Sequence, residues 1–448
     1  MSDLLAIGAS GVRAYQTALS TVSENIANSG VEGYARRSTT LREVSVTSGM
    51  TSQPWRAGNG VVATGVGRSA DPLKDAAVRN ASADLAKTET TGTWLDRIQS
   101  ALTDNRLDDR LTDFYTSATT LAADPTSLPA RATMIEAGSS VASSFSATGR
   151  ALDQAGADLD TTALQATTQM GVLAASLAKV NEGLGRADRN SGAAAQLGDQ
   201  RDSLVAQMSA LADVSMSTDE LGRATVRVGG NSGAIIVSNT DSGTMTYVRN
   251  GAGAVSFAVQ FGATNNAVTL GGGALAGVGE SAAKIQDAAD ALDALATRFT
   301  DSINGFQTGG GDLDGNAGAA MFTVTAGMPT EITVAMTDPR GIAAAATGGG
   351  PGDGSNLLAL QASRKTVAVE TGLSTLVAQN ATQIRQRSTI ADAQTAIRNG
   401  AVTSRDAVSG VNLDNEAVDL LRFQQAYSAS SRVIQVAREA FQSILSIN

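Results

Sequence analysis

The side chains that could carry out chemistry in this chain are carboxylates, arginines and hydroxyls, because its 448 residues include no histidine and no cysteine. Thiol nucleophiles, imidazole acid–base catalysis and zinc sites with Cys or His ligands are therefore excluded. The remaining carboxylate groups are Asp108-Asp109, the pair Asp199 and Asp202, and the segment from Asp312 to Asn316. None has the spacing of an acid–base pair or of a calcium loop. We predict surface charges for the first two groups and a turn for the third.

Two further segments have the residue types of an anion site. Gly352-Asp353-Gly354 lacks the lysine and the third glycine that a phosphate-binding loop needs. Arg36-Arg37 forms a small basic patch, which we interpret as a contact between subunits rather than as a phosphate site. The sequence therefore predicts no catalytic site, no cofactor and no metal site.

The overall charge restricts the partners. The chain has 43 acidic and 33 basic residues and a formal net charge of −10. Nucleic acids and anionic membrane surfaces both need a basic face, so neither is an expected partner. The first residues lack the basic and apolar regions of a Sec signal peptide, and no apolar run has the ~20 residues of a membrane span. We expect protein partners, with export by a route that needs no such peptide left open.

Both ends of the chain have the spacing of coiled-coil helices, with apolar residues three and four positions apart. Near the N-terminus these residues are Leu5, Val12, Tyr15, Leu19, Val22 and Ile26. Near the C-terminus they are Leu420, Phe423, Tyr427, Ile434, Phe441 and Ile444. Periodicity leaves two interpretations open: the two helices pack within one domain, or they also pack against the same helices of neighbouring subunits.

The pattern between the ends predicts the domain organisation. Helical periodicity dominates this region, with an extended arm after the first helix and a linker at Gly348–Gly354. A helix is expected at Asn356–Asn399, and Gly400–Gly410 leads into the terminal helix. From about residue 213, strand-like segments alternate with Gly, Asn and Asp turns. We therefore predict a mainly helical α+β chain, elongated and folded like a hairpin. Its expected parts are a terminal coiled-coil core (1–35 and 410–448), a helical domain (36–212 and 280–409) and an inserted β domain (213–279).

The two termini also carry sequence motifs. The N-terminal motif consists of Asn25, Ile26, Ala27 and Asn28, followed by Gly33 and Tyr34. The C-terminal motif runs from Ser409 to Asp414 and continues with Glu416, Leu420 and Gln424-Gln-Ala-Tyr427. Together they resemble the terminal signatures of bacterial flagellar axial proteins, the class of rod, hook and hook-associated proteins. Middle blocks such as Leu111–Tyr115 and Leu197–Leu204 are similar to the hook-associated members. One departure is Gly30-Val31-Glu32, where the family usually has Asn-Thr-Pro.

The resemblance implies a structural role in the extracellular flagellum, at the junction between hook and filament. It implies export through the flagellar type III apparatus and self-assembly into a ring or helical array. The implied partners are further copies of the chain, the hook protein, a neighbouring hook-associated junction protein and an export chaperone. The candidate chaperone contacts on the C-terminal helix are Leu420, Phe423, Tyr427, Ile434 and Phe441.

Other readings of the sequence remain. Within the same class, the alternative is the hook protein itself or another hook-associated or axial protein. Outside it, a wall glycosidase would need two buried carboxylates, and a coiled-coil scaffold would need only the terminal helices.

Overall fold

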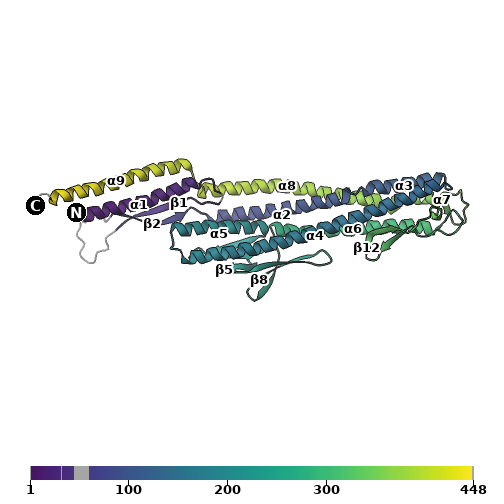
Figure 1. Cartoon of the computed structure of the whole chain (residues 1–448), viewed down its shortest axis with the longest axis horizontal. Coiled ribbons are helices and arrows are strands. Elements are labelled where there is room, and N and C mark those ends of the chain that lie inside the picture. The colour runs from purple at the N-terminus through teal and green to yellow at the C-terminus, as the bar shows by residue number, and fades with distance from the viewer. Residues whose placement is uncertain (1, 32, 45–59, 446–448) are drawn as a thin grey trace.

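The computed structural model describes residues 2–31, 33–44 and 60–445. It is an elongated, mainly helical α+β molecule, with the paired terminal helices at one end and the turn at residues 124–127 at the other, while the strands of residues 214–268 lie along the side of the helical body (Figure 1). The predicted fold class and the pairing of the two terminal helices are confirmed, whereas the expectation that the middle of the chain lies farthest from the termini was wrong, because the strands of residues 214–268 pack beside the helical body. The helices are α1 (Ser2–Ala27), α2 (Pro72–Thr103), α3 (Leu107–Ala123), α4 (Leu128–Arg186), α5 (Gly192–Leu211), α6 (Ala274–Thr308), η1 (Pro339–Gly341), α7 (Ser355–Val367), α8 (Val369–Ser409) and α9 (Leu413–Leu445).

Short antiparallel strands interrupt the helices. The strands are β1 (Arg37–Glu43), β2 (Val61–Arg68), β3 (Val214–Thr218), β4 (Ala224–Val228), β5 (Ala234–Ser238), β6 (Asp241–Ser242), β7 (Thr244–Arg249), β8 (Val255–Phe261), β9 (Thr264–Val268), β10 (Gly310–Gly311), β11 (Phe322–Thr325), β12 (Met328–Val334) and β13 (Ala345–Ala346). The pair β1–β2 forms an arm beside α1, and the strands from β3 to β9 form one sheet in the order β3-β4-β5-β6 and another in the order β7-β8-β9.

The helical body starts its long helices where the sequence provides caps. The Asp71 carboxylate accepts hydrogen bonds from the amides of Leu73 and Lys74, and Pro72 fits the first turn of α2. Ser127 caps α4 in the same way, by accepting from the Ala130 amide. Helix α4 then runs for 59 residues with one buried face, which makes it the main support of the body.

The hydrophobic core contains a cluster of four aromatic rings in the part of the body that is far from the termini. The rings of Phe114, Phe145 and Phe322 surround that of Phe299, with centroids 5.5, 5.8 and 5.4 Å from it. These four side chains come from α3, α4, β11 and α6, so one aromatic cluster joins elements that lie far apart in the sequence. Aromatic pairs at such distances add to the stabilisation that burial provides.

The strands from β3 to β9 are fixed to α4 by polar contacts. The Asp160 carboxylate accepts from Nε and Nη2 of Arg249 (2.8 and 2.7 Å) and from the Tyr247 hydroxyl (2.7 Å). The Arg249 hydrogen bonds hold the pKa of Asp160 below its ordinary value. The Asn181 amide donates to the Ala224 and Asn239 carbonyls at 2.8 and 2.7 Å. Both sheets therefore have a defined position on the helix beneath them.

Helix α8 brings the chain back along α2 towards the termini. Its buried Asn380 donates to the Leu95 carbonyl and to Gln99 Oε1, both at 2.9 Å. The expected end of this helix at Asn399 was wrong, because α8 continues through Gly400 to Ser409. A single glycine inside a helix costs only about 1 kcal/mol relative to alanine, and packing elsewhere along a long helix outweighs that cost.

Candidate assembly surface and its polar joint

The terminal helices α1 and α9 lie side by side and run antiparallel, so both ends of the chain lie at the same tip (Figure 1). Near that tip, a Cβ atom on Gly8 would lie 2.7 Å from Ile434 Cγ1 and 3.3 Å from the Ser430 carbonyl. Further along, the rings of Tyr15 and Phe423 have centroids 6.4 Å apart. Glycine at position 8 therefore allows the two backbones to approach closely.

The centre of this helix pair consists of small side chains. Ala14, Ala18 and Ala437 are at most 3% exposed, and Val22 is 4% exposed. Most of the predicted apolar positions are half-buried at the margins of the contact; they are Leu5, Val12, Tyr15, Leu19, Ile26, Leu420, Phe423, Tyr427 and Ile434. Phe441 is half exposed, and the side chain of Ile444 lies outside the described residues. The three-and-four spacing thus identified both helices and included Ala437, but it did not include Ala14 and Ala18, which are buried in the contact.

Helix α9 has a second apolar face on the side away from α1. Val418, Leu421, Val433 and Val436 are 66, 59, 39 and 63% exposed, and we refer to them as the outer stripe. At 100° per residue, Val418, Leu421 and Val436 lie roughly opposite the positions that contact α1, and Val433 lies at the side of the helix. The stripe consists of two pairs, Val418 with Leu421 and Val433 with Val436, about 18 Å apart along the helix. Exposed apolar side chains of this kind are typical of an interaction surface.

A polar joint connects the helix pair to the rest of the chain. At its centre is Asn25, whose side chain is fully buried. Asn25 Nδ2 donates to the Arg37 carbonyl (2.8 Å) and to Glu416 Oε2 (2.9 Å). Asn25 Oδ1 accepts from the Arg37 amide and from the Tyr34 hydroxyl, both at 2.9 Å. One amide side chain thus joins the end of α1, the start of β1 and the first turn of α9.

Glu416 is fully buried as well, and it pairs with Arg36. The distance from Arg36 Nε to Glu416 Oε1 is 2.6 Å, and Arg36 Nη2 also lies 3.4 Å from Asp419. The Arg36 amide donates to the Ser409 carbonyl at 2.8 Å. Loss of these donors would leave a buried carboxylate unpaired and would strongly destabilise the folded chain. The contact therefore fixes the position of the first turn of α9.

Two further arginines extend the joint to α5. Asp199 accepts from Arg37 Nη2 and from Arg68 Nε, both at 2.8 Å. Arg37 also pairs with Glu24 of α1 at 2.9 Å, and Arg68 pairs with Asp202 at 2.8 Å. Burial opposes the charge of Arg37, but hydrogen bonds to Asp199 and Glu24 outweigh it and raise the pKa of Arg37. The arm β1–β2 is therefore held between α1 and α5.

One prediction about charged residues was wrong, and another stays a prediction. Carboxylates of the same chain pair with both Arg36 and Arg37, and Arg37 is nearly buried, whereas the Arg36 side chain is still 30% exposed, so its contact with another subunit stays a prediction. Asp199 and Asp202 are not surface charges, since their side chains are only 14 and 16% exposed. The partners lie far apart along the chain, so no local pattern could indicate the pairing.

The N-terminal motif residues have different positions around this joint. Asn25 and Tyr34 belong to it, and Ile26 is half-buried on α1. Ala27 is exposed, and Asn28 donates to the Glu24 carbonyl. Gly33 has φ +81°, a left-handed conformation that glycine adopts without strain. This turn thus forms without the proline that the family usually has.

The other acidic candidates have structural partners. Asp108 and Asp109 are exposed, and Asp109 pairs with Arg106 at 2.7 Å. Asp312 accepts from the amides of Asp314 and Asn316, which confirms the predicted turn. Within the described ranges, no group of three His, Cys, Asp or Glu residues could hold a metal ion. The described helices likewise include none long and apolar enough to cross a membrane.

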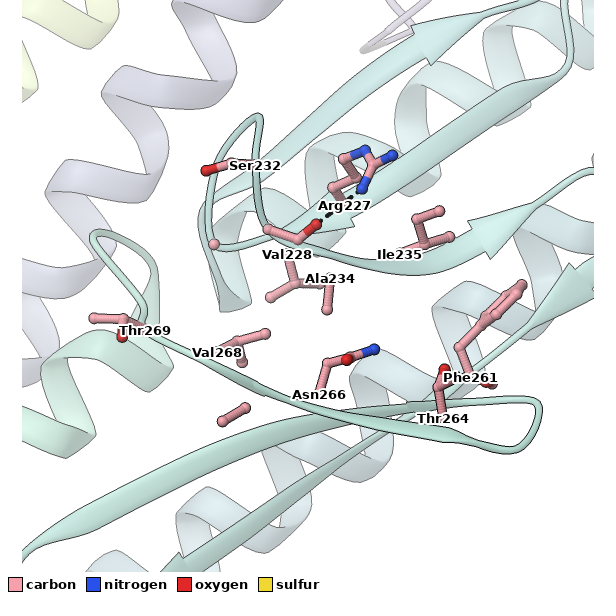
Figure 2. A pocket seen from close by; sticks show the side chains of 13 residues that line it. Arg227, Val228, Ser232, Ala234, Ile235, Phe261, Thr264, Asn266, Val268 and Thr269 are labelled. Carbon is pink, nitrogen blue, oxygen red and sulfur yellow. Dashed lines mark hydrogen bonds between the residues drawn. The ribbon is translucent and has the colours of Figure 1, made fainter.

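A cleft of about 550 Å³ lies between the two sheets of the β3–β9 region (Figure 2). Strand β9, with Asn266 and Val268, forms one wall, and β5, with Ala234, forms the other. Arg227 is the one ionisable side chain among the described lining residues, and it donates to the Gly233 carbonyl at 3.0 Å. The cleft therefore lacks the paired ionisable groups that acid–base chemistry requires.

Comparison with known proteins decides the family. The model of the flagellar hook-associated protein FlgK helical domain matches residues 93–322, which is just over half of the chain. The chain belongs to the FlgK family of flagellar hook-associated proteins. A second model, the C-terminal region of the flagellar basal body rod proteins FlgEFG, matches residues 404–447, which include α9.

Several relatives carry the name flagellar hook-associated protein 1. The protein from Salmonella typhimurium is 28% identical over 72% of this chain, and the match spans 60% of that relative's length. The Escherichia coli protein is 26% identical with both chains fully covered, and the Bacillus subtilis protein is 22% identical over 96% of this chain and 95% of the relative. The flagellar hook junction protein FlgK from Burkholderia pseudomallei shares the fold, with a TM-score of 0.64 and 15% identity over 74% of this chain and all of that one.

Membership of this family confirms two sequence predictions. FlgK-family proteins are structural components of the flagellum, so the predicted resemblance and the predicted absence of enzymatic function are both correct. Membership also implies assembly with flagellar components.

The polar joint generates a stability prediction. Replacing Asp199 by Asn leaves two partly buried arginines without their shared carboxylate, so we expect a loss of about 2–4 kcal/mol in the free energy of unfolding, measured with urea. Asp109→Asn is the matched control, because Asp109 also pairs with an arginine but is exposed; we expect a loss below about 1 kcal/mol. Equal losses in the two variants would contradict the role assigned to the joint.

Proposed function

We propose that this chain is a subunit of the junction between the flagellar hook and filament. The family assignment and the names of the relatives support this proposal. Copies of the chain assemble head-to-tail into a ring or helical array, with the α1/α9 pairs towards the axis and the helical body pointing outward. Head-to-tail contacts generate arrays of this kind, whereas a symmetric pair of faces would close into a dimer.

The observation that carries the proposal is the outer stripe of α9. One face of α9 packs on α1, and the outer stripe leaves four aliphatic side chains exposed. Burying each of them against a neighbour contributes about 1 kcal/mol or more, in proportion to the apolar area removed from water. A neighbouring α1/α9 pair provides a matching helical surface. The assembly residues are thus the predicted apolar positions of both helices together with the outer stripe.

We also propose a division of the chain into the three parts expected from the sequence. The core comprises 1–35 and 410–448, the helical domain 36–212 and 280–409, and the β domain 213–279. The polar joint lies where the core meets the helical domain, so it sets the angle between them. The hook protein and a neighbouring hook-associated protein are the partners above and below the ring, and the subunits reach this extracellular position through the type III apparatus.

The outer stripe can be tested in flagellated cells. In a strain that carries Leu421→Asp/Val436→Asp in place of the native chain, we expect hooks without filaments and a large loss of swimming, because the carboxylates would be buried between subunits. The control is Val248→Asp, at a 60% exposed position on β7. A stripe variant that is exported and assembles filaments at the native level would contradict the proposal.

We further propose that the export chaperone binds α9 on the face that later contacts α1. The contacts are Leu420, Phe423, Tyr427, Ile434 and Phe441. Four of these side chains are half-buried in the folded chain, so the chaperone binds α9 only while α1 is released from it. Chaperone and α1 therefore compete for one surface.

Calorimetry with the purified chaperone tests this assignment. Phe423→Asp/Ile434→Asp should weaken binding by at least about tenfold, since two apolar anchors become charged. Gln425→Asp/Gln435→Asp places the same charges at exposed positions of the same helix and should bind like the native chain. Unchanged affinity of the first variant would rule out this face as the binding site.

A further inference from the structure

Two long helices of the body present exposed faces without charged side chains. From Thr161 to Ala178, α4 has no charged residue in 18 positions, and Leu164 and Val172 are each 54% exposed there. From Thr371 to Ile384, α8 has no charged residue in 14 positions. We define the α4 face as the exposed residues Thr161, Leu164, Gln165, Thr168, Val172 and Ala175. We define the α8 face as the exposed residues Thr371, Ser374, Thr375, Ala378, Gln379 and Thr382.

Both faces point away from the core, on different sides of the body. At 100° per residue, Val172 lies about 180° from the buried Ala163, and Thr382 lies about 180° from the buried Leu373. Helices α2 and α6 each pack against both α4 and α8, so they separate the two faces. Figure 1 shows α8 along one edge of the molecule and α4 on the other side of α2.

The lack of charge distinguishes these faces from the other exposed helix surfaces of the body. A helix face in contact with water normally carries charged residues. At 17% charged residues overall, a stretch of 18 would include about three. The exposed face of α6 follows this rule, with Asp287, Asp290, Arg298 and Asp301. The α4 face and the α8 face instead lack the groups that are most costly to bury.

The net charge of the chain indicates which partner suits such faces. Copies with a formal net charge of −10 repel each other where charged surfaces meet. Identical copies therefore pack most favourably through uncharged surfaces, whereas a basic partner would favour the acidic face of α6. Head-to-tail association requires two different faces on one subunit. The α4 face and the α8 face satisfy both requirements.

The position of the outer stripe points to the same partner. Helix α8 leads into α9 through residues 410–412, and the two helices follow one another along one edge of the molecule (Figure 1). A neighbour that covers the outer stripe therefore lies on the side of the α8 face. A second copy in this position extends the contact from the terminal helices to the body.

We propose that the α8 face of one copy packs against the α4 face of the next copy in the array. This inference rests on the proposed function and deepens it, because it names the surfaces through which neighbouring bodies meet. Leu164 and Val172 become buried in this contact, and the hydroxyl and amide side chains around them pair across it. The contact places no charged side chain at its centre.

The absence of cysteine from the chain allows a crosslinking test that distinguishes a head-to-tail contact from a symmetric one. Flagella are isolated from a strain whose chain carries Thr168→Cys/Ala378→Cys and are treated with a bis-maleimide. With an antibody to this chain we expect dimers, trimers and longer products, because each copy presents one cysteine to each neighbour. The matched control is Thr297→Cys/Ala378→Cys, with its first cysteine on the exposed face of α6, and it should give monomer.

The single-cysteine variants complete this test, and neither Thr168→Cys nor Ala378→Cys alone should yield a dimer. A dimer from either one would show that a face meets its own copy, and a link to another flagellar protein would assign the face to that protein. Either result, or monomer alone from Thr168→Cys/Ala378→Cys, would overturn the inference and leave the proposed function standing while the chain is present in the flagella. Flagella that lack the chain would count against both.

A single added charge tests whether the contact excludes charged groups. Val172→Asp, made in the strain with the two cysteines, should lower the yield of dimer and longer products by about tenfold or more, because the carboxylate would be buried between copies. The control is Ala283→Asp, at an exposed position of α6, which should leave the yield unchanged.

The melting temperature of the purified chain separates this effect from a loss of folding. Because Val172 is exposed in the isolated chain, Val172→Asp should leave the melting temperature unchanged. A lower melting temperature would assign Val172 a role within the chain, and an unchanged yield of crosslinked products would show that the α4 face stays in water. Either result would contradict the proposed contact.

Discussion

The buried contact of Glu416 with Asn25 and Arg36 is the interaction on which the arrangement of this molecule depends. Glu416 belongs to the first turn of α9, Asn25 to the last turns of α1, and Arg36 to the segment that leads into the arm. A fully buried carboxylate requires specific donors, and only one alignment of α9 on α1 supplies both. Apolar packing of alanines and glycines tolerates small shifts along the helices. The polar contact therefore selects the register of α9 on α1, and the apolar contact provides the buried surface that stabilises the pair.

From this joint the structure extends in two directions. Towards the tip, α1 and α9 bury small residues between them and leave the outer stripe exposed. An exposed apolar surface of this kind can be buried against a neighbouring subunit. Towards the body, Asp199 and Asp202 connect the arm to α5, and α8 returns along α2. The aromatic cluster around Phe299 stabilises the body at the far end without help from the termini. The molecule thus combines a body with its own core and a terminal pair whose apolar surface is only half covered.

The sequence predicted the parts of this arrangement that follow from local patterns. The three-and-four spacing identified α1 and α9, the switch to alternating residues located the strands after Val214, and Asp71-Pro72 marked the start of α2. Contacts between distant residues could not be predicted in this way. Nothing near Arg37 indicates Asp199, and nothing near Asp199 indicates Arg68, because the pairing exists only once the arm lies on α5. Ala14 and Ala18 of the helix contact were missed because a heptad pattern is recognised by its large apolar side chains, whereas close packing of two helices selects small ones.

The family motif allowed an assignment that physical patterns alone would have left open. Asn25 and Tyr34 are motif residues, and the structure gives them a physical role as hydrogen-bond partners at the polar joint. Gly400 shows the opposite case. A glycine favours the end of a helix, but here the packing of the long helix α8 outweighs that local preference and the helix continues to Ser409.

Immunogold electron microscopy of cells that produce the native chain tests the central claim most directly. With an antibody to this chain, we expect label at a single point between hook and filament on each flagellum. Label distributed along the hook would assign the chain to the hook itself, and flagella without label would contradict a role in the assembled structure.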